Sequence, residues 1–142
     1  MSKTIKPEDI EKELKDYLQN YTEDIQEDVE TITNTSIKQA KEELIQTSPR
    51  DGIARDKKYY KGWAIKNGYK TRKKQNKYTK VLWNKTNYQL THLLEFGHAK
   101  SDGTGFVKAQ PHIRKVEEKY GTKFADLLKN KIRRSAKWHC KS

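Results

Sequence analysis

The chain contains few residues that cross-link or sharply bend a polypeptide: of its 142 residues, one is cysteine, three are proline and seven are glycine. A single cysteine, Cys140, excludes an internal disulfide framework, which fits a reducing compartment. No apolar run approaches the ~20 residues that a membrane-spanning helix needs, and residues 1–7 lack the apolar segment of a signal peptide. These absences predict a soluble protein made in the cytoplasm.

Apolar residues are also scarce. They make up 32% of the sequence, against 35% for charged residues, whereas a globular domain usually has an apolar share of about 45–50%. Aromatic residues reach 10%, which argues against disorder of the whole chain. A chain of this length with so few apolar residues has a thin core, so we expect subunit contacts to supply further burial in an oligomer.

The net charge of +12 is unevenly distributed. Residues 1–48 hold 12 acidic and 6 basic side chains, and residues 49–142 hold 7 acidic and 25 basic ones. An acidic segment joined to a basic one suggests partners of opposite charge or head-to-tail self-association. Nucleic acid is the alternative partner for the basic part.

The first third of the chain reads as one long helix from Pro7 to Thr47. Its apolar side chains recur mostly every three or four residues, the spacing that lines one helix face. β-Branched and cap-forming residues gather at 31–36, where we expect a bend or break. Such a helix would be about 60 Å long at 1.5 Å per residue. Part of it should therefore project or meet a neighbouring subunit.

A polar loop at 50–58 precedes two strand-like runs, 59–70 and 78–84, in which apolar and polar side chains alternate. The residues between them are polar and cationic, so we expect a long antiparallel hairpin with a basic tip at 71–77. The hairpin residues that we expect in the core are Trp63, Ile65, Val81 and Trp83.

The C-terminal half adds a short element and a second long helix. Residues 86–96 have both helical spacing and strand-like alternation; we favour a short helix ended by Gly97, because glycine tolerates a left-handed cap. Residues 106–110 suggest a short strand, and Pro111 begins an amphipathic helix that runs to residue 132. The sequence therefore predicts an α+β fold in which a long N-terminal helix, a small antiparallel sheet of three to four strands, a short helix and a C-terminal helix follow one another.

We expect a single domain made of three parts. The long acidic helix occupies residues 1–48, the α+β body occupies 49–132, and a loose basic tail occupies 133–142.

The basic hairpin tip is a candidate binding surface. Aromatic side chains flank it, and cations beside stacking rings suit single-stranded or non-specific nucleic-acid binding. An acidic partner protein would suit it equally. Alternatively, the tip binds nothing, and its lysines only keep the edge of the sheet solvated and prevent aggregation. The tip cations are Lys70, Arg72, Lys73, Lys74 and Lys77.

Three short blocks resemble one known family. The first block comprises Ser48, Pro49 and Gly52, followed by Tyr60 and Trp63. The second comprises Tyr88, Leu94, Glu95, Phe96 and Gly97, and the third comprises Ala109, Pro111, His112 and Ile113. In this order and at about this spacing, the blocks resemble the head–tail joining proteins of long-tailed bacteriophages, also called neck or tail-completion proteins. The form with His98 and His112 is most similar to proteins from phages of low-GC Gram-positive hosts.

The resemblance implies a non-enzymatic virion assembly protein. Its fold would be a small α+β subunit, often arranged in a ring, at the junction of head and tail. Its partners would be copies of itself and the neighbouring connector, head-completion and tail-terminator proteins, with non-specific DNA contact also in question. It would assemble in the host cytoplasm and end in the virion, without a cofactor. A cytoplasmic nucleic-acid-binding module that uses the basic tip and tail is the alternative.

The residues themselves favour structural over catalytic roles. We expect Gly97 to let the chain reverse, Phe96 to anchor it, Glu95 to accept backbone N–H bonds from the next loop, and Pro111 to fix the chain before a helix. His92 with Glu95 or Asp102 could form an acid–base pair, but no nucleophile accompanies them. The histidines His92, His98, His112 and His139 lack the paired spacing of zinc ligands, so no metal site is expected.

Overall fold

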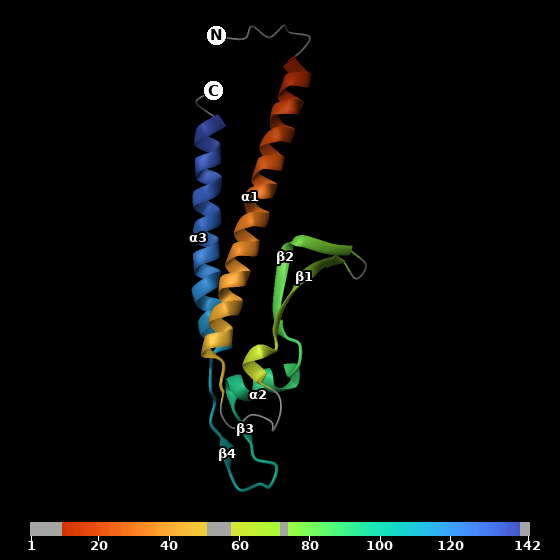
Figure 1. Cartoon of the computed structure of the whole chain (residues 1–142). Coiled ribbons are helices and arrows are strands. Elements are labelled where there is room, and N and C mark those ends of the chain that lie inside the picture. Colours follow the sequence, from red (N-terminus) through yellow and green to blue (C-terminus); the bar gives the residue numbers. More distant parts are fainter. Residues whose placement is uncertain (1–9, 51–57, 72–73, 140–142) are drawn as a thin grey trace.

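Figure 1 shows a computed structural model of the chain, which describes residues 10–50, 58–71 and 74–139. The helices are α1 (Ile10–Thr47), α2 (Thr91–Phe96) and α3 (Ile113–His139), with 3₁₀ turns at Tyr59–Lys61 and Tyr88–Leu90. The strands are β1 (Trp63–Thr71), β2 (Lys74–Asn84), β3 (His98–Ala99) and β4 (Phe106–Val107). The predicted α+β class and the order of its helices are confirmed.

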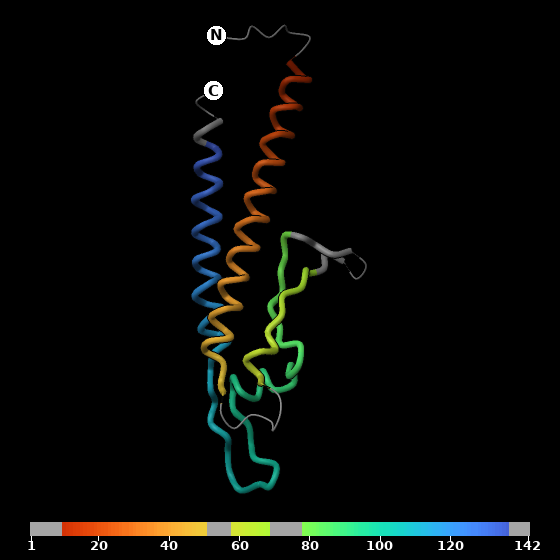
Figure 2. Tube along the Cα trace, in the orientation of Figure 1, coloured from red at the N-terminus to blue at the C-terminus, as the bar shows by residue number. Residues whose placement is uncertain are grey.

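Helices α1 and α3 lie side by side and run in opposite directions (Figures 1 and 2). Two ion pairs join them: Lys119 Nζ lies 2.6 Å from Glu43 Oε2, and Lys131 Nζ lies 3.1 Å from Asp28 Oδ1. The hairpin of β1 and β2 stands on the other side of α1 (Figure 1). The long N-terminal helix is therefore the central element of the described chain. None of the described helices combines the length and apolar character needed to span a membrane.

Helix α1 runs unbroken through residues 31–36, so the bend expected there is not seen. The threonines of this patch are accommodated within the helix. The hydroxyl of Thr33 donates to the Val29 carbonyl at 2.6 Å, and that of Thr35 donates to the Thr31 carbonyl at 2.9 Å. Bonding to the carbonyl four residues earlier satisfies a threonine hydroxyl without an interruption of the helix.

The expected loose tail from residue 133 is corrected, because α3 continues to His139. This segment has neither glycine nor proline, and its arginines and lysine are good helix formers. Their positive charges also suit the negative end of a helix. Polarity was therefore a poor guide to where this helix ends.

The four described strands form two separate two-stranded antiparallel sheets. In the larger sheet Trp63 pairs with Asn84 and Ile65 with Leu82, so these four side chains share one face. Val81 is 37% exposed and lies opposite Lys66 on the other face. The expected core set of the hairpin is thus split between two faces. Residues 59–61, expected at the start of a strand, form a 3₁₀ turn instead.

The buried apolar core of the described residues is small. It lies where α1, the start of the hairpin and the first turns of α3 meet, and it comprises Ala40, Leu44, Tyr59, Trp63 and Val116. Large apolar side chains remain exposed on every layer, including Leu14 at 55%, Leu18 at 52% and Leu127 at 43%. A small core beside exposed apolar side chains agrees with the composition of the chain.

Candidate functional site

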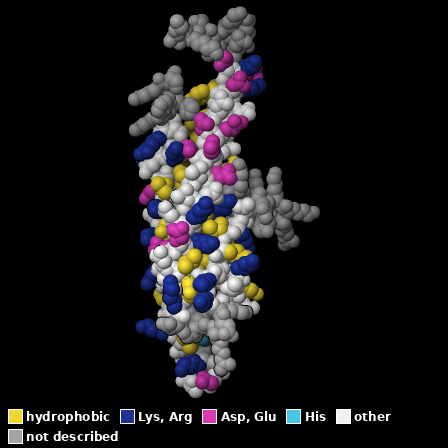
Figure 3. All heavy atoms as spheres, viewed as in Figure 1, with side chains coloured by type: hydrophobic (Ala, Val, Ile, Leu, Met, Phe, Trp, Pro, Cys, Tyr) yellow, Lys and Arg dark blue, Asp and Glu magenta, His cyan; other side chains and the backbone are white. Residues whose placement is uncertain are grey.

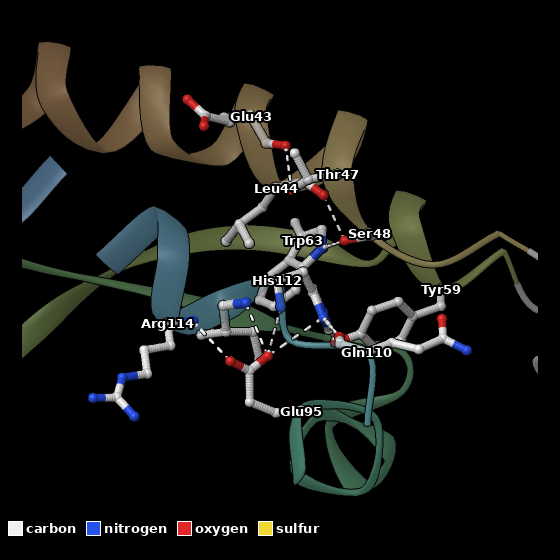
Figure 4. A network of polar contacts seen from close by, with 11 residues as sticks. Glu43, Leu44, Thr47, Ser48, Tyr59, Trp63, Glu95, Gln110, His112 and Arg114 are labelled. Atoms are coloured by element: carbon white, nitrogen blue, oxygen red, sulfur yellow. Dashed lines mark hydrogen bonds and ion pairs between the residues drawn. The ribbon is translucent and has the colours of Figure 1, made fainter. Parts of the chain in front are cut away.

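Residues from all three sequence blocks meet in one buried polar junction beneath the core (Figure 4). Ser48 comes from the end of α1, Trp63 from the start of β1, Glu95 from α2 and His112 from the residue before α3. All four are buried, with 3–7% of each side chain exposed. Segments that are far apart in the sequence are therefore joined at a single place.

Glu95 holds the beginning of α3. Its Oε2 accepts the backbone N–H groups of His112 and Ile113, each at 2.9 Å, and its Oε1 accepts that of Arg114 at 2.9 Å. The first N–H groups of a helix have no partner within the helix, and a carboxylate also favours the positive end of the helix dipole. Glu95 thus caps the start of α3 from another helix, and its N–H donors are residues 112–114, not the loop that follows Gly97 as predicted.

The environment of Glu95 determines its charge. Burial alone would raise the pKa of this carboxyl, but the backbone N–H bonds from His112, Arg114 and Ile113 outweigh it and hold the pKa below its ordinary value of 4.5. Hydrogen bonds to a carboxylate favour its charged form. Glu95 is therefore ionised at neutral pH, as its capping role requires.

His112 connects Glu95 to the aromatic core. Its Nδ1 lies 2.8 Å from the Gln110 carbonyl and its Nε2 lies 2.9 Å from the Tyr59 hydroxyl. A carbonyl can only accept, so Nδ1 carries a hydrogen, and Nε2 and the Tyr59 hydroxyl share the second hydrogen bond. The imidazole also meets Tyr59 and Trp63 edge to face, with ring centroids 5.5 and 6.2 Å apart. Both nitrogens and both neighbouring rings fix its orientation.

Ser48 ties the end of α1 to the hairpin. Its hydroxyl accepts a hydrogen bond from the Trp63 indole N–H at 2.8 Å and donates to the carbonyl of Leu44. The half-buried Pro49 follows and prevents the helix from continuing. The junction thus fixes the direction in which the chain leaves α1.

Tyr59, not its neighbour Tyr60, is the buried aromatic residue of the first block. Only 1% of Tyr59 is exposed, and burial raises the pKa of its hydroxyl. Tyr60 is half-buried, with the Arg50 guanidinium 4.4 Å from its ring. Sequence reasoning named Tyr60, because it belongs to the first block of the family resemblance.

Two asparagines were missed altogether. Asn84 is 1% exposed; its side-chain N–H donates to the Tyr59 carbonyl at 2.9 Å, and its side-chain oxygen accepts the Asn87 backbone N–H at 2.8 Å. Gly62 lies so close that an added Cβ would be 2.3 Å from the Asn84 oxygen. Asparagine is rare within strands and common in turns, so two asparagines three residues apart were the available signal.

The other residues of the sequence blocks occupy varied positions. Leu94 packs against the core and its carbonyl accepts the Gln110 backbone N–H at 2.7 Å. The expected anchor Phe96 is 72% exposed, which corrects that prediction: it ends α2 on the side away from the core. Of the remaining residues, Ala109 and Ile113 are half-buried, Pro111 and Tyr88 are exposed, and Gly52 lies outside the described residues.

The cations of the hairpin tip contribute little to this description. Arg72 and Lys73 lie outside the described residues. Lys70, Lys74 and Lys77 lie on the tip-side ends of β1 and β2, but their side chains also lie outside the described part of the chain. Nucleic-acid contact at this tip stays a prediction.

The geometry of the junction suits a structural role, in which polar side chains hold segments of the chain together. Both oxygens of Glu95 accept backbone N–H bonds, and Asp102 accepts the hydroxyl and the N–H of Thr104 at 2.6 and 2.9 Å. The expected acid–base partners of His92 are thus engaged elsewhere. Over residues 10–50, 58–71 and 74–139, no group of three or more His, Cys, Asp or Glu side chains could hold a metal ion.

Acid should weaken this junction. Because the pKa of Glu95 is lowered in the folded chain, its contribution to the free energy of unfolding is present above pH 4.5 and is lost as the pH falls through the folded-state pKa. We expect urea unfolding between about pH 3 and pH 7 to show a steeper loss of stability on acidification in the natural chain than in Glu95→Gln. Equal slopes would contradict this assignment.

Comparison with known families identifies one match. Residues 12–97 match a family whose description is "Bacteriophage HK97-gp10, putative tail-component". The matched segment includes α1 from its third residue, the hairpin and α2, and thus Ser48, Trp63 and Glu95 of the junction but not His112. Comparisons with curated proteins and with solved structures give no match.

Proposed function

The chain belongs to the HK97-gp10-like family of bacteriophage tail components, and from this membership we propose that it is a head–tail joining subunit of a long-tailed phage. In this role it is a neck or tail-completion protein that forms a ring between the head connector and the tail. It assembles in the host cytoplasm, remains in the virion and catalyses no reaction. The family match over residues 12–97 is the observation that carries the proposal.

The distribution of buried and exposed surface supports an assembly role. The described chain has five buried apolar residues, whereas large apolar side chains such as Ile10, Phe96 and Phe106 are 54–72% exposed. Exposed apolar side chains on several faces suit a subunit that is surrounded by copies of itself and by other virion proteins. The partners that fit are the connector or head-completion protein on one side and the tail terminator on the other.

The junction of Glu95 and His112 would keep each subunit of the ring rigid. A ring transmits a fixed geometry from head to tail only if each subunit is rigid. The capping bonds of Glu95 hold α3 against α2, and the Ser48–Trp63 bond holds α1 against the hairpin. We therefore propose one domain in which the helix pair forms a rigid pillar, and residues 50–58, 71–77 and 98–105, which the sequence predicts as loops, contact adjacent rings.

A cytoplasmic nucleic-acid-binding module remains the alternative function. It would use the cationic hairpin tip and the basic end of the chain, which in a virion could equally contact DNA passing through the ring. The tip side chains lie outside the described residues, and the family match favours the structural role.

Native mass spectrometry and electron microscopy test the proposal. We expect closed rings of the purified chain at high concentration or when the connector and tail proteins of the same phage are present. Negative-stain images should show a central opening. A strict monomer under all of these conditions would contradict the proposed function.

A further inference from the structure

The two long helices present opposite charges on their outward sides. Along the helical pillar, acidic side chains gather on the upper half of α1 and basic side chains on α3 (Figure 3). Residues 10–30 hold eight acidic and two basic side chains, and residues 121–139 hold six basic and one acidic. The asymmetry seen in the sequence therefore becomes two neighbouring surfaces of opposite sign.

The acidic surface of α1 points away from α3. Asp16, Glu23 and Glu27 are exposed, and their spacing of seven and four residues places them on one helix face. The α1 residues in polar contact with α3 are Asp28, Gln39 and Glu43. At 100° per residue, the three exposed acids lie about 100–200° around the helix from those contacts. We call this surface the acidic face.

The basic surface of α3 points away from α1. Lys129 and Arg133 are exposed and lie two residues before and after Lys131, which contacts Asp28 of α1. Two residues turn a helix by about 200°, so both side chains lie nearly opposite to Lys131. Lys119 and Lys123, which also contact α1, lie about 40–120° around α3 from the two side chains, and the buried Val116 and the core-packed Tyr120 lie about 100–180° from them. We call this surface the basic face.

Glu23 and Glu27 of the acidic face lie at the same height along the pillar as the basic face. The contact between Lys131 and Asp28 fixes the register, and the charged residues of both faces nearest to it lie within about five residues, or 8 Å. Two copies placed side by side and pointing in the same direction would bring the acidic face of one against the basic face of the next. No shift along the helix axis is needed.

Symmetry distinguishes this arrangement from a twofold dimer. Because the two faces point away from each other, a twofold contact through either one would pair it with its own copy, which would place Glu23 and Glu27 against the same acids, or Lys129 and Arg133 against the same bases. Such like-charge contacts are unfavourable. Contact between different faces is favourable, and it repeats from copy to copy until the rotation closes a ring.

We propose that the acidic face, Asp16, Glu23 and Glu27, binds the basic face, Lys129 and Arg133, of a second copy of this chain that points in the same direction. The proposal rests on the proposed function, because repetition of the contact would close the head–tail ring. Exposed ion pairs are screened by salt, so ring formation weakens as the NaCl concentration rises.

Charge reversal on each face tests the contact. Glu23→Lys with Glu27→Lys reverses the acidic face, and Lys129→Glu with Arg133→Glu reverses the basic face. Each variant alone should self-associate at least tenfold more weakly than the natural chain in sedimentation velocity and native mass spectrometry. An equimolar mixture should restore mixed oligomers, because the reversed acidic face of one variant, now basic, meets the reversed basic face of the other, now acidic, while the two natural faces also meet each other.

The mixture also separates contacts between chains from contacts within one chain. If charge reversal acted by repulsion between α1 and α3 of the same molecule, mixing would restore nothing. The control variant Lys85→Glu with Lys108→Glu makes the same change in net charge as the basic-face variant, at exposed residues outside the long helices, and it should assemble as the natural chain does. Circular dichroism verifies that each variant is folded.

The results distinguish the contact from the ring itself. If both face variants formed rings as readily as the natural chain, the proposed contact would be wrong although the protein still forms a ring. The same would follow if both variants were folded but their mixture formed no mixed oligomers. A natural chain that stays monomeric even with its phage partners would overturn the proposed function as well.

Discussion

Replacing Glu95 by alanine is expected to lower the free energy of unfolding by about 3 kcal/mol. The substitution removes a buried acceptor that serves three backbone N–H groups at the start of α3. Those donors lie beside the core, where no other described acceptor replaces the carboxylate. A hydrogen bond to a charged group is worth about 1.5–3 kcal/mol, and part of the loss is recovered when water reaches the Arg114 N–H.

Chemical unfolding measures this loss, with Glu117→Ala as the matched control. Glu117 is an exposed acid on the second turn of α3, and its replacement should change the stability by less than about 0.5 kcal/mol. For a chain of this size, the loss at Glu95 corresponds to a fall of about 10 °C in the melting temperature. A change at Glu95 as small as that at Glu117 would show that α3 does not depend on this cap.

The importance of Glu95 could be predicted from the sequence, but its partner could not. A glutamate two residues before a glycine at the end of a short helix indicates a shape-determining position. Which N–H groups it binds depends on how a later segment folds back, and neither periodicity nor local spacing contains that information. The donors at residues 112–114 are 17 to 19 positions away along the chain.

The helices were predicted more accurately than the small elements between them. Apolar spacing identified α1 and α3 because each repeats its pattern over many turns. The hairpin faces were assigned wrongly because the pairing register places Trp63 opposite Asn84, and register depends on the partner strand.

Exposure was the property that the sequence predicted least well. Phe96 was expected to anchor the turn, yet it is 72% exposed, whereas the polar Asn84 is 1% exposed. Hydrophobicity ranks residues by average burial, but a small core leaves some aromatic side chains outside and uses polar side chains to hold loops. In an assembly subunit the exposed aromatic residues are also candidates for contact with neighbouring proteins.

Gly97, which follows Glu95 and Phe96, is the second position at which a substitution should greatly lower the free energy of unfolding. Gly97→Ala is expected to lower the free energy of unfolding by about 3 kcal/mol. Gly97 has φ of +76°, and an added Cβ would lie 2.6 Å from the Val107 carbonyl oxygen and 3.0 Å from the Ala109 backbone nitrogen. Both obstacles are backbone atoms of the segment that leads to His112, so the methyl group would push that segment away from α2.

Gly103→Ala separates steric exclusion from backbone strain. Gly103 has a similar φ of +71°, but nothing lies within 4 Å of its added Cβ. Its replacement therefore incurs only the conformational cost of a left-handed residue, about 1 kcal/mol. The difference between the two variants in thermal and urea unfolding measures the close approach of residues 107–109 to Gly97. If both variants lost the same stability, the reversal after α2 would need only a permissive backbone, and the joint between α2 and α3 would depend on Glu95 alone.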